Sequence, residues 1–129
     1  MDGGSAGELP AGYPFKPEYE VSPIATKRDG LPILDVRLVE EFEFAHVDGS
    51  VHVPLHELED RVDELVLDAG EPSAVMCHHG VRSMKAAVML RALGYPKAYS
   101  IAGGIELWSL TADSSLPRYE RDGAVVKGV

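Results

Sequence analysis

The chain has 129 residues, a formal net charge of −9 at pH 7 and a single cysteine, Cys77. One cysteine excludes an intramolecular disulfide and a metal site built from several cysteines, and the acidic balance argues against binding to nucleic acids or anionic membranes. The first five residues lack the basic and apolar blocks of a signal peptide, and no apolar run approaches the roughly 18 residues of a membrane span. We therefore expect a single-domain cytoplasmic protein with no nucleic-acid or membrane partner.

The first 17 residues are rich in glycine and proline, so we expect an irregular arm, which Tyr13 and Phe15 could fix to the surface. After the arm, short apolar runs typical of strands alternate with segments of helical periodicity. In chain order they predict a strand at 33–36, one or two helical turns at 39–44, a strand at 51–54, an amphipathic helix at 55–66, a strand at 74–77, a mostly buried helix at 82–93, a strand at 97–100 and a short helix through residue 108.

This alternation of strands and helices indicates the α/β class. We expect a three-layer architecture in which a parallel sheet of about four to five short strands is flanked by helices. The predicted organisation is an irregular N-terminal arm at residues 1–17, one domain at 18–119 and a polar C-terminal tail at 120–129.

The segment at 77–83, Cys-His-His-Gly-Val-Arg-Ser, follows a predicted buried strand and opens a helix. Ligands of open parallel sheets bind beyond the carboxyl ends of the strands, and loop amides and a helix N-terminus there favour an anion. Gly80 lets the loop turn tightly, and Arg82 adds a positive charge. These features favour a reactive thiolate at Cys77; the alternative is a cysteine that is only packed at the end of a core strand.

Several other polar residues have two readings each. Asp35 ends a buried strand, where it either steadies Arg82 or the loop amides, or caps a turn. Arg37 more readily holds structure than binds substrate. His78 and His79 could take part in anion binding when protonated, or could be exposed and tolerant of substitution. Adjacent loop residues rarely aim at one ion, so we expect no metal site and no cofactor.

The loop at 77–83 resembles the C-x-x-G-x-R-S active loop of single-domain rhodaneses, which are sulfurtransferases. Three other stretches resemble family motifs in the same order: Leu34-Asp35-Val36-Arg37 followed by Glu41-Phe42, the stretch 45–54, and Gly103-Gly104 through Trp108. Ala45 and Ser50 depart from the family pattern, but the match extends over residues 19–119. The resemblance implies a rhodanese-like fold.

The resemblance also implies a function. Cys77 would be the nucleophile that takes a sulfane sulfur from a small anionic donor (thiosulfate or a persulfide) and passes it, as a persulfide, to a thiol or protein acceptor. The residues expected to bind the donor are His78, His79, Gly80, Val81 and Arg82, and Asp35 and Arg37 are expected to support them.

Two other functions stay open at this point. One is a non-catalytic interaction module on the same fold, although such modules typically lack the loop cysteine. The other is a cysteine-dependent phosphatase or arsenate reductase. Those enzymes use C-x5-R, whereas four residues separate Cys77 from Arg82 here, which makes a narrower cradle.

Overall fold

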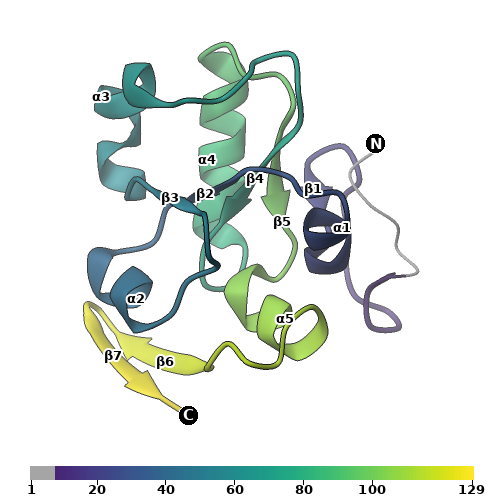
Figure 1. Ribbon diagram of the computed structural model, residues 1–129, viewed down its shortest axis with the longest axis vertical. Helices are drawn as coiled ribbons and strands as arrows, with labels where there is room; N and C mark the ends of the chain where they lie inside the picture. Colours follow the sequence, from purple (N-terminus) through teal and green to yellow (C-terminus); the bar gives the residue numbers. More distant parts are fainter. Residues whose placement is uncertain (1–7) are drawn as a thin grey trace.

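A computed structural model describes residues 8–129. Its helices and strands are, in chain order, β1 (Glu20–Val21), α1 (Pro23–Arg28), β2 (Ile33–Asp35), α2 (Val39–Phe44), β3 (Val51–His52), η2 (Leu55–Glu57), α3 (Leu58–Arg61), η3 (Val62–Glu64), β4 (Ser73–Met76), α4 (Val81–Ala92), β5 (Ala98–Ile101), α5 (Gly104–Thr111), β6 (Tyr119–Asp122) and β7 (Val125–Gly128). The first five strands form one parallel sheet in the order β1-β5-β4-β2-β3 (Figure 1). The expected α/β architecture is confirmed.

The sheet is covered on both faces, because its central strand β4 is fully buried and sends alternate side chains in opposite directions. Val75 packs in one apolar cluster with residues of α3 and α4, such as Leu58 and Leu90. Met76 packs in a second cluster with residues of α1 and α5, including Trp108. The carboxyl end of β4 therefore emerges between two helical layers, and the cysteine loop starts there.

Two elements near the N-terminus were not predicted. The edge strand β1 has only two residues, and α1 has six. The sequence does carry a helix signal here: the Ser22 side chain accepts a hydrogen bond from the Ala25 amide at 3.0 Å, and Pro23 occupies the first helical position.

The prediction of a single amphipathic helix at 55–66 is wrong. This segment is divided into two 3₁₀ turns with one α-turn between them, η2, α3 and η3. Apolar side chains three residues apart also share one side of a 3₁₀ turn, so the same pattern of buried positions fits the broken segment. The acidic residues of this segment repel one another, and Arg61, paired with Glu57 and Glu64, relieves part of this repulsion.

Residues 120–129, expected as a polar tail, instead lie almost entirely in an antiparallel hairpin of β6 and β7. The turn contains Asp122-Gly123, with Gly123 at φ 57°, and two valines follow it in β7. The hairpin packs beside α2 at the carboxyl end of the parallel sheet (Figure 1), and the Tyr119 ring makes an edge contact with Phe44 at 5.6 Å.

The part of the expected arm that the structure describes, residues 8–17, is largely irregular. Tyr13 and Phe15 are both half-buried, and the Tyr13 hydroxyl lies against Gly103 at the start of α5. Residues 1–7 of the arm lie outside the described residues. Within residues 8–129 no helix combines the length and the apolar character that a membrane crossing requires.

Candidate active site

The loop at 77–83 connects β4 to α4 at the carboxyl end of the sheet and forms the floor of a cavity of about 910 Å³. Cys77, His78, His79, Val81 and Arg82 all line the cavity. The opposite wall is formed by Glu106 of α5, residues 118–123 and Val129. The structure thus brings the loop residues expected from the sequence to one cavity, except Gly80, and it adds the hairpin as a wall that the sequence did not reveal.

The Cys77 sulfur is held by a backbone amide and a hydroxyl group. Sγ accepts a hydrogen bond from the Gly80 amide at 3.0 Å and lies 3.2 Å from Ser83 Oγ, which in turn lies 2.7 Å from Ser100 Oγ. A serine hydroxyl can accept from a thiol or, after rotation, donate to a thiolate. The same set of groups therefore fits both protonation states of Cys77.

Three glycines give the loop its shape. Gly80 has φ 100° and caps α4, while Gly103 and Gly104, at φ 69° and 60°, begin α5. A Cβ atom on Gly104 would collide with the carbonyl oxygen of Cys77. The Gly-Gly pair therefore allows the N-terminus of α5 to lie directly against the cysteine loop.

The first turn of α5 binds the loop carbonyls. The Ile105 amide donates to the Cys77 carbonyl at 2.8 Å, and the Glu106 amide donates to the His78 carbonyl at 3.2 Å. In a trans peptide the N–H points opposite to the C=O. The amides of His78 and His79 consequently point away from α5.

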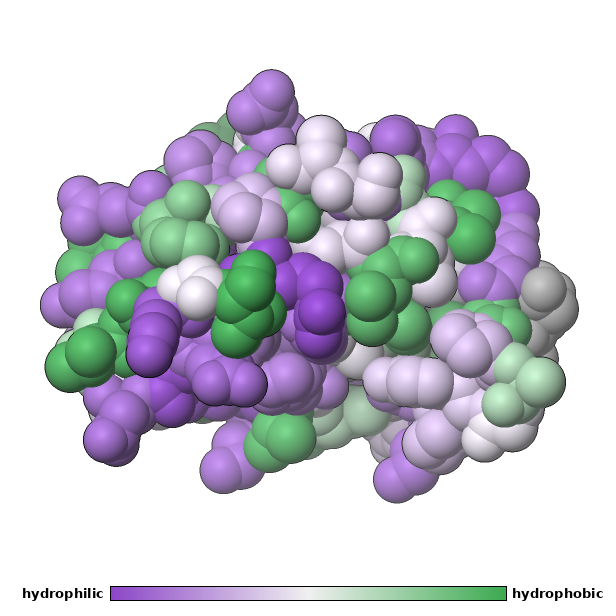
Figure 2. Space-filling model, turned by 90° about the horizontal axis from the view of Figure 1, so that it is seen from below, coloured by the Kyte–Doolittle hydropathy of each residue, from purple (hydrophilic) through white to green (hydrophobic). Residues whose placement is uncertain are grey.

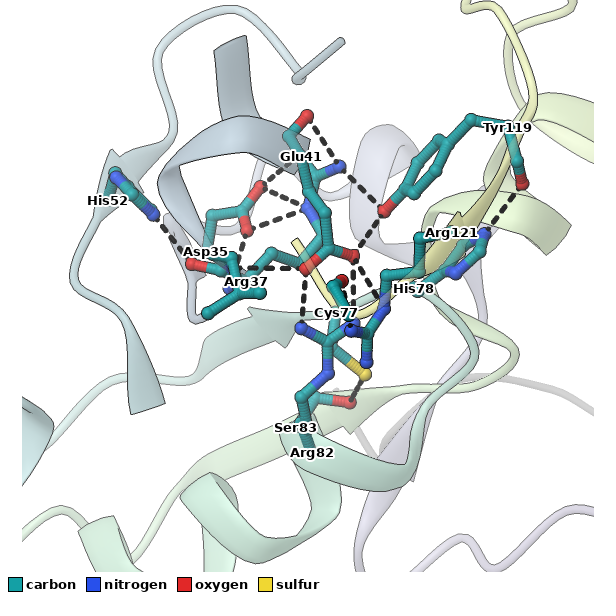
Figure 3. Close-up of polar contacts among 12 residues, drawn as sticks. Asp35, Arg37, Glu41, His52, Cys77, His78, Arg82, Ser83, Tyr119 and Arg121 are labelled. Atoms are coloured by element: carbon teal, nitrogen blue, oxygen red, sulfur yellow. Dashed lines mark hydrogen bonds and ion pairs between the residues drawn. The ribbon is translucent and has the colours of Figure 1, made fainter. Parts of the chain in front are cut away.

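Arg82 is tied to a buried carboxylate. Its two terminal nitrogens donate to the Glu41 oxygens at 2.7 and 2.9 Å, and Glu41 is fully buried in α2. Burial alone raises the pKa of Glu41, but hydrogen bonds from Arg82 and Tyr119 outweigh it and lower the pKa to about 2. The sequence placed Glu41 in a motif without a role; in the structure it is the anchor of the loop arginine (Figure 3).

Asp35 and Arg37 form a second buried pair beside this one. Arg37 donates from Nε and a terminal nitrogen to the two Asp35 oxygens at 2.9 and 2.7 Å, and from its other terminal nitrogen to the Tyr119 hydroxyl at 3.1 Å. Of the two roles expected for Asp35, contact with Arg82 or the loop amides is not present among the described residues, whereas its Oδ1 accepts a hydrogen bond from the Arg37 amide at 3.1 Å and so caps the turn. Asp35 instead fixes Arg37, which reaches the site through Tyr119.

The two loop histidines differ. His78 is buried, stacks on the Tyr119 ring at 4.0 Å and places Nε2 3.0 Å from the Tyr119 carbonyl. Since a carbonyl only accepts, Nε2 carries the proton. Burial, together with the neighbouring His79, lowers the pKa of His78 to about 4. His78 is therefore neutral near pH 7 and supplies no positive charge for anion binding, whereas His79 is exposed.

Tyr119 was missed by the sequence analysis, which placed it at the end of the domain. Its hydroxyl donates to Glu41 at 2.7 Å and accepts from Arg37, and burial raises its pKa, so it stays a neutral donor. Ser100 was missed as well. The one local signal for it is a hydroxyl in an otherwise apolar buried strand.

The mouth of the cavity is chemically mixed. Seen from the side of the hairpin and α5, strongly hydrophilic and strongly hydrophobic side chains lie next to each other near the centre of the face (Figure 2). The apolar contribution to the cavity lining comes in part from Val81 and Val129, each about two-thirds exposed (67% and 66%). No group of three potential metal-ligating side chains occurs within residues 8–129.

Comparisons with known proteins agree with this geometry. The family model described as Rhodanese-like domain matches residues 22–111. Thiosulfate sulfurtransferase GlpE of Pseudomonas syringae is 39% identical over 87 residues, which cover 67% of this chain and 80% of that protein. Putative sulfur carrier protein YrkF of Bacillus subtilis is 38% identical over 96 residues, 72% of this chain and 51% of that protein.

Two solved structures extend the comparison. Reduced CoADR-RHD of Bacillus anthracis is 28% identical with a TM-score of 0.65, over 76% of this chain and 18% of that chain. The human single-domain sulfurtransferase TSTD1 is 25% identical with a TM-score of 0.54, over 64% of this chain and 85% of that chain.

Replacing Gly104 with alanine should destabilise the protein by about 2–4 kcal/mol, because the new Cβ meets the Cys77 carbonyl. Gly30→Ala is the matched control, since Gly30 has a similar φ of 62° with nothing within 4 Å. Urea unfolding measures both. Equal losses in the two variants would contradict the close approach.

The pH dependence of stability should contain a contribution from His78. Because the folded state lowers the pKa of His78 to about 4, this contribution is complete above the ordinary value of about 6.5 and is lost as the pH falls toward about 4, by up to about 3 kcal/mol. Urea unfolding between pH 7 and pH 4 measures it. His78→Gln keeps a donor for the Tyr119 carbonyl but does not titrate, so its curve should be flatter; identical slopes would refute the assignment.

Tyr119→Phe should cost about 1–2 kcal/mol of stability, because it removes a donor to buried Glu41 and an acceptor for Arg37 while keeping the ring that stacks on His78. Glu41 also loses a group that lowers its pKa, so its folded pKa moves back toward 4.5 and less stability should be lost through this group between about pH 4.5 and pH 2 than in wild type. Unchanged stability and an unchanged acid transition would show that the hydroxyl contributes nothing.

Proposed function

This chain belongs to the rhodanese-like domain family and is a rhodanese-type sulfurtransferase, and we propose that it carries the sulfur as a persulfide on Cys77. The single observation that carries this proposal is the position of the Cys77 sulfur. Cys77 lines the cavity although only 1% of the residue is exposed, and its Sγ accepts a hydrogen bond from the Gly80 amide at the N-terminus of α4. The amide and the helix N-terminus beside this sulfur support the binding of negative charge there, and the cavity supports the approach of a donor.

In the first step the Cys77 thiolate attacks the outer sulfur of a donor such as thiosulfate. A Cys77 S–S bond forms, the S–S bond of thiosulfate breaks, and sulfite leaves with the electron pair. The product is a persulfide anion. The amides of residues 78–82 are suited to hold its terminal sulfur as an oxyanion hole holds developing charge, because α5 binds the carbonyls of Cys77 and His78 on its own side.

In the second step a thiophilic acceptor attacks the terminal sulfur. The new bond forms between the acceptor and that sulfur, the S–S bond of the persulfide breaks, and Cys77 returns as a thiolate. Cyanide can serve as the acceptor in an assay, and a thiol or a protein is its natural counterpart. The cavity of about 910 Å³ is large for a small inorganic anion and supports an acceptor thiol on a larger molecule.

The other loop residues support these steps in different ways. Gly80 supplies the amide and the turn, and Arg82 shapes the loop through Glu41. His79, exposed at the mouth, is placed to meet the donor. Phosphatase or arsenate reductase chemistry is not favoured, because two nitrogens of Arg82 are already bound to Glu41 and are not free to bracket a tetrahedral oxyanion.

Intact-mass analysis tests the persulfide directly. Wild-type protein incubated with thiosulfate and freed of excess reagent should gain about 32 Da, the mass of one sulfur, and dithiothreitol should remove it. Cyanide added to the loaded protein should release thiocyanate and restore the original mass.

Cys77→Ser is the control variant, since it keeps the size of the side chain and removes the sulfur. It should neither gain mass nor form thiocyanate. Sulfur uptake by the serine variant would exclude Cys77 as the carrier. If the wild type takes up no sulfur from thiosulfate or from glutathione persulfide, the sulfur-transfer proposal fails and the non-catalytic module is favoured.

A further inference from the structure

The cavity needs a positive charge to attract an anionic donor, because the whole chain carries −9. Three arginines line it, Arg82, Arg118 and Arg121. Arg82 is bound to Glu41 through two hydrogen bonds. Arg118 spans the cavity wall to Glu106, at 2.6 Å in the shortest contact. Each of these two arginines thus has a carboxylate as partner.

Arg121 has no carboxylate of its own. Its Nε lies 3.5 Å from the Glu41 oxygen Oε1, the carboxylate that Arg82 already occupies, and one terminal nitrogen donates to the Gly123 carbonyl at 2.9 Å. Figure 3 shows its guanidinium beside that of Arg82, next to Glu41 and His78. Two guanidinium groups therefore share one carboxylate.

The neighbouring charges do not cancel this excess. Asp35 is matched by Arg37. Glu120 and Asp122 also line the cavity, at positions that alternate with Arg121 along β6, and no ion pair joins either of them to Arg121 among the described residues. Among the side chains around Glu41, one positive charge remains, and the hairpin supplies it.

We propose that Arg121, on β6 outside the family-matched residues 22–111, is the residue that favours anionic over neutral reagents at Cys77. This assignment rests on the proposed function. It adds that the hairpin, through Arg121, selects an anionic donor. The Arg121 side chain is 30% exposed, so its charge acts on the cavity and on the solvent at its mouth.

Alkylation of Cys77 tests this charge without any sulfur chemistry. Iodoacetate and iodoacetamide react with a thiolate in the same way and differ in charge. At low salt, Arg121→Gln should lower the ratio of the iodoacetate rate to the iodoacetamide rate by about three- to tenfold, the effect expected of one partly exposed charge at short range. Arg121→Lys should keep most of the ratio, since it retains the charge.

Lys127→Gln is the matched control. It removes one positive charge from the other strand of the same hairpin, on a side chain that does not line the cavity. It should leave the ratio within about twofold of wild type, because the charge that it removes lies outside the cavity. The effect of Arg121→Gln should shrink at about 1 M salt, where the Debye length is about 3 Å. An equal change in both glutamine variants, or no change in Arg121→Gln, would overturn the proposal.

Thiosulfate kinetics separate this proposal from the proposed function. With cyanide as acceptor, Arg121→Gln should raise KM for thiosulfate by about three- to tenfold and leave kcat within about twofold. If the alkylation ratio falls as expected but wild type forms no persulfide, Arg121 remains the charge-selecting residue and the sulfur-transfer proposal fails. If persulfide forms while the ratio is the same in all variants, the Arg121 assignment fails and sulfur transfer stands.

Discussion

The buried carboxylate of Glu41 is the interaction on which the site depends. A charge without exposure to water is strongly destabilising unless hydrogen bonds and opposite charges surround it. Glu41 is fully buried and receives Arg82 from the start of α4, Tyr119 from β6 and the Leu38 amide from its own helix cap. Each donor comes from a different part of the fold. The loop, α2 and the hairpin are consequently held in one arrangement, because moving any of them would leave a buried charge with too few partners.

The cysteine loop divides its tasks between backbone and side chains. The N-terminus of α4 presents an amide to the Cys77 sulfur, while the N-terminus of α5 binds the carbonyls of Cys77 and His78. Carbonyl oxygens beside the proposed persulfide anion would repel it. The hydrogen bonds from α5 that hold the carbonyls of Cys77 and His78 therefore matter as much as the Gly80 amide that binds the sulfur. This arrangement needs glycine at 80, 103 and 104, since each has a positive φ and a Cβ atom there would meet backbone atoms at 80 and 104 and side chains at 103. The side chains of the loop then serve mainly to fix its shape.

The elements that could be predicted from the sequence are those with local signals. The alternation of strand and helix patterns predicted the parallel sheet, and the motif around the single cysteine predicted the loop that lines the cavity. The remaining features depend on contacts between distant residues. Glu41 and Tyr119 are 78 residues apart, and the sequence around each residue does not indicate that the two are in contact. A buried Asp35 signals that some partner exists, but the sequence left open whether it contacts Arg82 or the loop amides or caps a turn, and it did not indicate Arg37. The Asp122-Gly123 turn between short strands was a real hairpin signal, hidden by the polar composition around it.

The hairpin also changes how the charge of the protein relates to its chemistry. A chain of net charge −9 repels anions such as thiosulfate, the proposed donor, and a large positive patch to overcome this repulsion would attract other anions as well. One arginine in excess around a shared carboxylate is a smaller adjustment, confined to the cavity. It also lies on an element separate from the loop that holds the sulfur. If Arg121 selects the donor as proposed, this selection can vary with the hairpin while the amides of the cysteine loop stay the same. Chemistry and specificity would then be separated, as a rigid sheet with a variable wall allows.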